Sequence, residues 1–159
     1  TLVKGEFVCI TGSDDYWSLD KLALQVRFME TNPLVAVCSG NFIKIDSQGE
    51  LLPEKEQKQA PERTYGFEEV MMRDFPFSST LSMIRKSVLD EVGGYDPALK
   101  IEDYFMWLKI SHAGYQLHLL NNKLGFYRIH EDNTNIKASK RFKSIIKFFD
   151  KKVYFFFFI

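Results

Sequence analysis

FVCITGSDD, residues 7–15, joins a short apolar run to a flexible, acidic end. The apolar run at residues 7–10 is followed by turn-forming residues, which predicts a buried β-strand that leads into a loop. Open α/β sheets bind their ligands at the carboxyl ends of strands, so the carboxylates of Asp14 and Asp15 are well placed to meet a ligand. The stretch therefore predicts an α/β sheet with a binding site where this strand ends.

The segment that follows predicts an amphipathic helix. Ser18 can cap its start, and apolar residues then recur at steps of three and four, which predicts one stripe facing the core. This stripe consists of Leu19, Leu22, Val26 and Met29. Asn32 and Pro33 are expected to end the helix.

Strands and helices alternate along the rest of the chain, without an internal repeat. Strands are expected at residues 35–39, 80–84, 115–120 and 124–129, and a hairpin is expected at residues 42–52. Helices are expected at residues 67–74, 86–92 and 102–113, and residues 53–63 predict a mobile surface loop. This alternation predicts the α/β class.

The composition is that of one folded domain or part of one. Of the 159 residues, 45% are hydrophobic and 26% are charged, which excludes an intrinsically disordered chain. Residues 137–159 hold seven Lys or Arg and one acid, a net charge of +6 that leaves −6 on the other residues of this neutral chain. Because nucleic-acid backbones require clustered Lys and Arg, the acidic body argues against nucleic acid as a partner.

Two cysteines, Cys9 and Cys38, each lie inside an apolar run. Free cysteines are among the most buried residues, so the pattern predicts two buried thiols in strands. Two isolated cysteines imply no disulfide framework, which suits a reducing cytosol. We therefore expect a cytoplasmic protein.

Three features could carry chemistry, and each has a structural alternative. The adjacent carboxylates of Asp14 and Asp15 repel one another unless a cation lies between them, which favours Mg²⁺ or Mn²⁺ with diphosphate oxygens, although acids also suit a helix N-terminus. Glu102 and Asp103 begin a predicted apolar helix, where a carboxylate could act as a general base or cap the helix. His130 ends a predicted strand and could be a metal ligand or an ordinary surface or core histidine.

Four blocks of sequence stand in a fixed order along the chain. They read GEF…GSDDYW…DKL…Q in residues 5–25, MIRKSVLDEVGGYD at residues 83–96, EDYFMWL at residues 102–108 and YRIH at residues 127–130. In this order, they resemble the metal-binding segment, the acceptor-side segment, the E-D-x-x-x-W-L segment and the Y-R-x-H segment of the family 2 inverting glycosyltransferases. The resemblance covers residues 4–133 and implies a partial GT-A fold, a mixed sheet flanked by helices.

The resemblance also implies a role for five residues. Asp15, with Asp14 beside it, would hold the divalent ion and the diphosphate and ribose of the donor. His130 would lie near the metal and the leaving diphosphate. Asp103 would deprotonate the acceptor hydroxyl for in-line attack with inversion at the anomeric carbon, and Glu102 would orient that site.

The same resemblance implies the organisation and the substrates. Residues 1–136 would form the metal-, donor- and acceptor-binding part of a GT-A catalytic domain. The donor would be a nucleotide sugar, expected to be UDP-linked, and the acceptor a glycan or a lipid-linked glycan. Mg²⁺ or Mn²⁺ would be the cofactor.

The chain departs from the family pattern in three places. Gly12 stands where many members carry the first Asp of D-S-D-D, which removes one potential contact to metal or ribose. Ser18 and Leu19 replace the usual x-Pro, a change we expect to be harmless. Family members begin with a βαβ unit that binds the nucleotide base, and this sequence starts after it. We therefore expect a C-terminal catalytic half that is inactive alone.

Two other functions remain open at this point. One is a non-catalytic remnant or binding module, which would share the fold but lack turnover. The other is a sugar-phosphate nucleotidyltransferase, which is disfavoured because nothing near the start of the chain resembles a Gly-rich, basic phosphate loop.

Residues 137–159 predict a basic amphipathic helix with a Phe-rich end. Its apolar stripe consists of Phe142, Ile145, Ile146, Phe149 and Val153. Such a helix could lie on an anionic membrane, which would place the protein peripherally on the inner membrane face. Alternatively, its apolar stripe packs on other parts of the protein.

Overall fold

The computed structural model describes residues 3–72, 75–96 and 102–130. Its strands are β1 (Phe7–Cys9), β2 (Tyr16–Trp17), β3 (Val35–Ile45), β4 (Arg63–Tyr65), β5 (Met83–Arg85) and β6 (Gln116–Arg128). Its helices are α1 (Lys21–Thr31), α2 (Phe67–Met71), α3 (Lys86–Glu91) and α4 (Glu102–His112), with short 3₁₀ helices at Glu54–Glu56 and Ser79–Leu81. None of the helices in this described part is long and apolar enough to cross a membrane.

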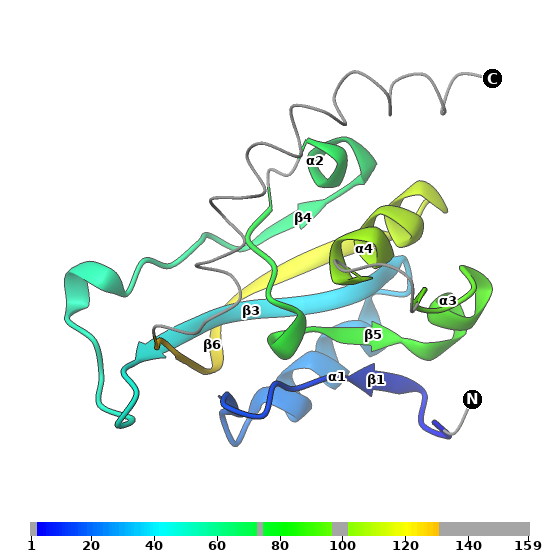
Figure 1. Ribbon diagram of the computed structural model, residues 1–159. Coiled ribbons are helices and arrows are strands. Elements are labelled where there is room, and N and C mark those ends of the chain that lie inside the picture. Colours follow the sequence, from blue (N-terminus) through cyan, green and yellow to red (C-terminus); the bar gives the residue numbers. More distant parts are fainter. Residues whose placement is uncertain (1–2, 73–74, 97–101, 131–159) are drawn as a thin grey trace.

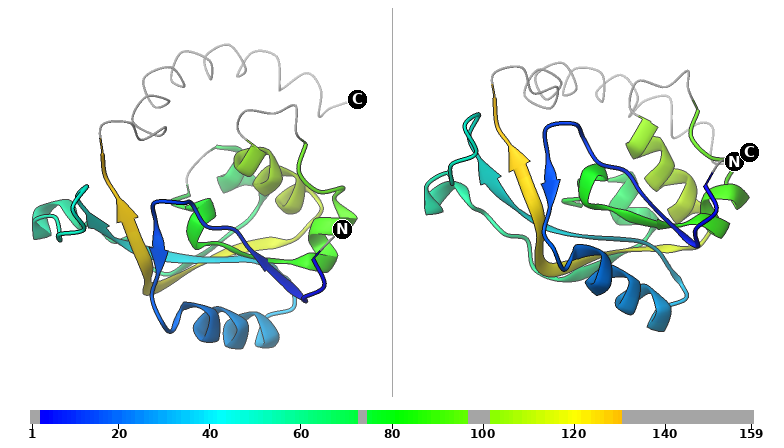
Figure 2. Two further views of the ribbon diagram at one scale, coloured as in Figure 1. Left: turned by 60° about the horizontal axis from the view of Figure 1, so that its bottom comes forward. Right: turned by 90° about the horizontal axis from the view of Figure 1, so that it is seen from below.

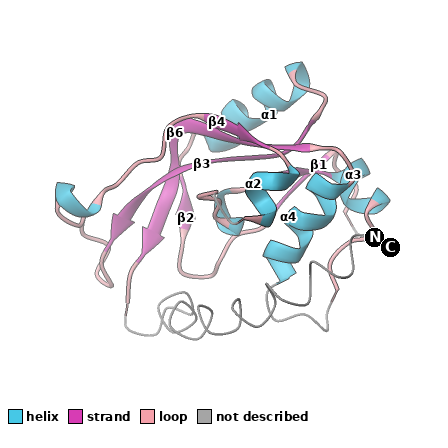
Figure 3. Ribbon diagram, turned by 90° about the horizontal axis from the view of Figure 1, so that it is seen from above, coloured by secondary structure: helices cyan, strands magenta, loops and turns pink. Residues whose placement is uncertain are grey.

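The strands form one mixed sheet with helices on both faces, as the sequence predicted (Figure 1). The strand order is β1-β5-β3-β6-β2, and β4 pairs with β6 beyond this path. α1 lies on one face of the sheet, and α2 and α4 lie on the other (Figures 2 and 3). The expected helix at residues 137–159 lies outside the described residues.

The two long strands β3 and β6 run parallel through the centre of the sheet. Their pairing extends from Val35 opposite Gln116 to Ile45 opposite Arg128, with a bulge at Asn41. The sequence predicted two strands where the structure has the single strand β6. Residues 121–123 are exposed at this irregular point, and their polar side chains resemble a loop in the sequence.

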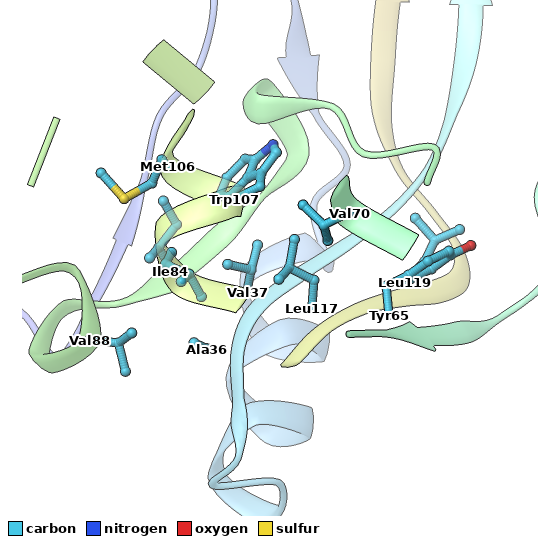
Figure 4. Packing of buried hydrophobic residues seen from close by; sticks show 11 residues of the cluster. Ala36, Val37, Tyr65, Val70, Ile84, Val88, Met106, Trp107, Leu117 and Leu119 are labelled. Atoms are coloured by element: carbon cyan, nitrogen blue, oxygen red, sulfur yellow. The ribbon is translucent and has the colours of Figure 1, made fainter. Parts of the chain in front are cut away.

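The main core lies between the sheet and the pair α2 and α4. Trp107 and Met106 of α4 point toward the sheet residues Ile84 and Val37 (Figure 4). A second buried cluster lies under α1 and contains Met29, Cys38, Leu81, Met83, Leu120 and Leu124. Successive strand residues point to opposite faces, and the consecutive buried residues Val35–Cys38 of β3 and Leu117–Leu120 of β6 show that both sides of the sheet are covered there.

The predicted apolar stripe of α1 is wrong, except at Met29 and, in part, Val26. Leu19 is 107% exposed and precedes the helix, and Leu22 is 46% exposed. The helix instead buries Lys21, Gln25 and Met29, which are spaced four residues apart.

Two polar side chains can occupy this buried face because they find partners there. The Gln25 side-chain amide donates hydrogen bonds to the carbonyl oxygens of Cys38 (2.6 Å) and Leu81 (2.9 Å). The Lys21 ammonium lies 3.7 Å from the Cys9 sulfur and 4.1 Å from the centre of the Trp17 ring. Burial lowers the pKa of Lys21, and this cost is partly offset by the sulfur and the aromatic ring.

The edges of the sheet differ most from the prediction. β1 is half-buried rather than buried, because within the described residues it pairs only with β5. Cys38 is buried as expected, whereas Cys9 on β1 is only partly buried; both thiols are free. The short strands β2 and β4 were not predicted, and the expected strand at residues 80–84 begins with a 3₁₀ helix.

The expected loop at residues 53–63 runs beside the end of β3 and is fastened to it. The Gln57 side chain accepts a hydrogen bond from the Lys44 amide and donates one to the Lys44 carbonyl, each at 2.8 Å. The predicted hairpin is present as a tight turn after β3, closed by an isolated bridge between Ile45 and Leu51.

We predict that Gly125→Ala destabilises the fold, because β2 approaches β6 closely at this glycine. A Cβ atom there would lie 2.7 Å from the Tyr16 carbonyl oxygen and 2.7 Å from a Leu81 methyl group. Such overpacking costs about 1–3 kcal/mol, measurable by urea unfolding. Gly5→Ala, whose Cβ would meet only the Phe7 carbonyl oxygen at 3.4 Å, is the control and should stay within about 0.5 kcal/mol. Equal stability of the two variants would contradict the prediction.

Candidate functional site

The loop at residues 10–15, between β1 and β2, lies beside the end of β6. β2 pairs antiparallel with β6, with Tyr16 opposite Phe126, and this pairing brings the two segments together (Figure 2). We call residues 10–15 the acidic loop, because it carries Asp14 and Asp15. The site predicted at the end of β1 is therefore built from two segments that are more than a hundred residues apart in sequence.

Each carboxylate of the acidic loop accepts one hydrogen bond from the end of β6. Asp15 Oδ1 accepts from the Arg128 backbone amide at 3.0 Å, and Asp14 Oδ2 lies 3.0 Å from His130 Nε2. The bond from His130 is the main reason why the pKa of Asp14 lies below its usual value. Of the three residues predicted to hold a metal, the structure places Asp14 in contact with His130, and Asp15 lies next to Asp14 in the loop.

Gly12 marks the point where the other carboxylate oxygens converge. A Cβ atom on Gly12 would lie 3.1 Å from Asp14 Oδ1 and 3.6 Å from Asp15 Oδ2, so both oxygens border the same small space. Neither of these oxygens is the one that binds His130 or Arg128. The glycine that departs from the family pattern therefore leaves room beside two carboxylate oxygens.

This arrangement fits a hard divalent cation that takes only part of its ligands from protein. Mg²⁺ is commonly held by one or two carboxylates, with water and substrate phosphates as the other ligands. Within residues 3–72, 75–96 and 102–130, no three His, Cys, Asp or Glu side chains are arranged as a complete metal site. The two converging carboxylates therefore fit an ion that arrives with a diphosphate.

The segment around the 3₁₀ helix Ser79–Leu81 also borders the acidic loop. Trp17 Nε1 donates a 2.8 Å hydrogen bond to the Thr80 carbonyl, and the Thr80 methyl group lies 3.5 Å from the Cβ position of Gly12. In the sequence, the hydroxyl-rich run at residues 77–80 resembles the entrance to a strand more than an acceptor-contacting edge. Its position beside Gly12 depends on tertiary packing and could not be read from the sequence.

Glu102 and Asp103 lie in the first turn of α4, as predicted. Glu102 is exposed and Asp103 is half-buried, and an Asp103 oxygen accepts a 2.7 Å hydrogen bond from the Tyr104 amide. Burial, together with the charges of Asp103 and Glu102, raises the pKa of the neighbouring Tyr95 to about 12.

The two acidic pairs remain separate features of the site. Among the residues that the structure describes, no hydrogen bond or ion pair joins Glu102 or Asp103 to the acidic loop. Both features nevertheless lie on the face of the sheet opposite α1, with the start of α4 and the dark blue acidic loop on the same side in Figure 2. A substrate that touches the loop could extend over this face toward α4.

Residues 2–156 match the family model described as glycosyltransferase-like family 2. The chain belongs to this family.

Curated relatives of this glycosyltransferase-like chain include two named transferases. It is 25% identical over 146 residues to the UDP-Glc:alpha-D-GlcNAc-diphosphoundecaprenol beta-1,3-glucosyltransferase WfaP of Escherichia coli, covering 92% of this chain and 53% of WfaP. It is also 25% identical over 123 residues to the amylovoran biosynthesis glycosyltransferase AmsE of Erwinia amylovora, covering 77% of this chain and 45% of AmsE. The chain thus spans about half the length of the curated relatives it matches.

Solved structures of glycosyltransferases share the fold. The mannosyltransferase PcManGT from Pyrobaculum calidifontis, in complex with GDP-Man and Mn²⁺, matches with a TM-score of 0.61 and 17% identity over 95% of this chain and 40% of that one. The S. aureus TarS 1-349 structure in complex with UDP matches with a TM-score of 0.57 and 17% identity over 80% of this chain and 37% of that one. The family 2 chain described here therefore carries part of a GT-A fold.

We predict that His130→Ala raises the pKa of the Asp14 carboxyl toward its usual value, because the hydrogen bond from His130 is the largest cause of the lowering. An NMR titration of the Asp14 side-chain carbon measures this. Since the folded-state pKa lies below the unfolded one, the bond stabilises the fold near neutral pH and this contribution is lost as the pH falls through the folded-state value. His112→Ala, whose ring packs against Phe67, is the control and should leave Asp14 unchanged. An unchanged Asp14 pKa in His130→Ala would refute the pairing.

Proposed function

We propose that this chain is the metal- and acceptor-binding part of a glycosyltransferase that moves a sugar from a nucleotide-sugar donor with inversion at the anomeric carbon. The observation that carries the proposal is the convergence of Asp14 Oδ1 and Asp15 Oδ2 beside Gly12, at the carboxyl end of β1. Two negatively charged oxygens at such an edge suit a cation that accompanies a diphosphate. Family membership supports transfer rather than nucleotidyl chemistry.

In this proposal Asp14 and Asp15 hold Mg²⁺ or Mn²⁺ together with the donor diphosphate. When bound, the ion neutralises the charge that develops on the leaving diphosphate. His130, already in contact with the second oxygen of Asp14, lies where it can orient that carboxylate or contact the diphosphate. PcManGT, which was solved with GDP-Man and Mn²⁺, supports a divalent ion in proteins of this fold.

Asp103 is proposed to remove the proton from the acceptor hydroxyl, and Glu102 to orient the acceptor. A base must hold a fixed direction, and the first turn of α4 provides this because the helix is anchored by Met106, Trp107 and Ile110 in the main core. A base on one side of the anomeric carbon and the leaving diphosphate on the other are what in-line attack with inversion requires.

The relatives suggest the substrates. WfaP uses UDP-Glc and a diphosphoundecaprenol acceptor by its name, which supports a UDP-linked donor and a lipid-linked glycan acceptor here. We propose that the basic segment at residues 137–159 holds the protein peripherally on the cytoplasmic face of a membrane, where such an acceptor would be met. A non-catalytic binding module is the alternative, and it is favoured over a nucleotidyltransferase because the described start of the chain has no Gly-rich, basic phosphate loop.

We predict that Asp15→Asn weakens Mn²⁺-dependent UDP binding by at least about tenfold, or 1.4 kcal/mol. The amide keeps an oxygen for the Arg128 backbone amide but loses the charge that attracts the cation. Calorimetric titration of UDP with and without Mn²⁺ measures the effect. Asp20→Asn, an exposed aspartate at the start of α1, is the control and should bind as wild type. Wild-type affinity in Asp15→Asn would remove the metal assignment.

We predict that Asp103→Asn in the active enzyme lowers turnover by roughly 10²–10⁴, the usual contribution of a positioned base. The amide has the same shape but cannot accept the proton, so UDP affinity should stay near the wild-type value. Single-turnover assays with a UDP-sugar, paired with UDP titration, separate the two effects. Asp90→Asn, which removes a surface partner of Lys86, is the matched control. A loss of less than about tenfold would mean that another residue is the base.

A further inference from the structure

We propose that Arg128 is a positioning residue, which fixes the backbone of the acidic loop against the turn that follows β3. The proposal rests on the metal-dependent function proposed above, because its consequence is the geometry of Asp14 and Asp15. It assigns a role to Arg128, for which the sequence offered only membership of the YRIH block.

The Arg128 guanidinium binds backbone carbonyl oxygens from two separate segments. Its Nε donates to the Asp14 carbonyl at 3.1 Å. Its Nη1 donates to the carbonyls of Asp46 and Ser47, each at 3.1 Å. Because the guanidinium is rigid and planar, these three bonds fix the acidic loop and the turn relative to one another.

The main chain of Arg128 adds a direct bond to the site. Its amide donates to Asp15 Oδ1 at 3.0 Å, so this one residue holds the backbone of Asp14 and the side chain of Asp15. Arg128 is itself held by the sheet, since it lies opposite Ile45 and the next amide, of Ile129, donates to the Ile45 carbonyl at 2.8 Å. These bonds therefore fix the position of the acidic loop relative to β3 and β6.

Hydrogen bonds within the turn at residues 46–49 hold its backbone in shape. The Asp46 carboxylate accepts the amides of Gln48 (2.8 Å) and Glu50 (2.9 Å), so it shapes the turn. Gly49 has a φ of +93°, and a Cβ atom there would lie 3.7 Å from Arg128 Nη1. The positive φ therefore favours a glycine at this position of the turn.

The Arg128 guanidinium acts on the acidic loop through a backbone carbonyl. Its three bonds go to the backbone carbonyl oxygens of Asp14, Asp46 and Ser47. The guanidinium thus orients the loop through carbonyls, and a cation can still be attracted by Asp14 and Asp15. A lysine would keep the positive charge but could not reproduce the planar fork.

The test compares Arg128→Lys and Arg128→Met with wild type, and Arg63→Lys is the control because it changes an exposed arginine paired with Glu69. Hydrogen exchange of the metal-free protein is read at residues 10–15, 46–50 and 35–40. Free Mn²⁺, counted by electron paramagnetic resonance, gives the Mn²⁺ affinity. Both Arg128 variants should exchange faster in the first two segments but not in β3, and should bind Mn²⁺ roughly 10–100-fold more weakly. Arg63→Lys should match wild type.

Gly49→Ala tests the turn at residues 46–49, which the Arg128 guanidinium binds. This variant can replace Arg128→Met if that variant fails to fold. It should raise exchange at residues 10–15 in the wild-type background and add little in Arg128→Lys, because contacts within one network are not additive. The proposal would be overturned if Arg128→Lys kept the wild-type exchange rates and Mn²⁺ affinity while Arg128→Met exchanged faster and bound Mn²⁺ more weakly. That result would show that only the charge of Arg128 matters. If wild type binds no Mn²⁺, the proposed function fails, while the exchange of the acidic loop still decides the role of Arg128.

Discussion

The pairing of β2 with β6 is the contact on which the site depends. Only two residues of β2 pair, Tyr16 with Phe126 and Trp17 with Gly125, and the Tyr16 and Phe126 rings stack with their centres 4.6 Å apart. This pairing brings the acidic loop beside the end of β6, where Arg128 and His130 bind it. Gly125 permits it, because any side chain there would press against the Tyr16 carbonyl.

The neighbouring carboxylates of Asp14 and Asp15 repel each other. Hydrogen-bond donors lie at the carboxylate oxygens that do not face Gly12. The Arg128 amide and His130 Nε2 each approach an oxygen that does not face Gly12. For Asp14 the bond from His130 favours the charged form and lowers its pKa. In the proposed function, the oxygens that face Gly12 would be the ones that attract the cation.

The parts of the molecule that could be predicted from sequence are those that depend on local order. The acidic loop follows a strand directly, and the start of α4 and the Gly93-Gly94 end of α3 are also local signals, so all three were placed correctly. β2 and β4 were missed because strands of two or three residues are defined by their partner, not by their own pattern. The buried face of α1 was misjudged because Lys21 and Gln25 are tolerated only through contacts with distant segments. For the same reason the sequence could name Arg128 but could not show that it joins two loops.

The sheet is also what relates the two acidic pairs to each other. Asp14 and Asp15 are tied to β6 through Arg128, and Asp103 is tied to β3, β5 and β6 through the core residues of α4. Within the described residues, neither acidic pair contacts the other. The distance between the pairs is therefore set by the strands of the sheet, which are rigid because they are closely packed. In the proposed mechanism, the cation would lie at one acidic pair and the base at the other, with the substrate between them.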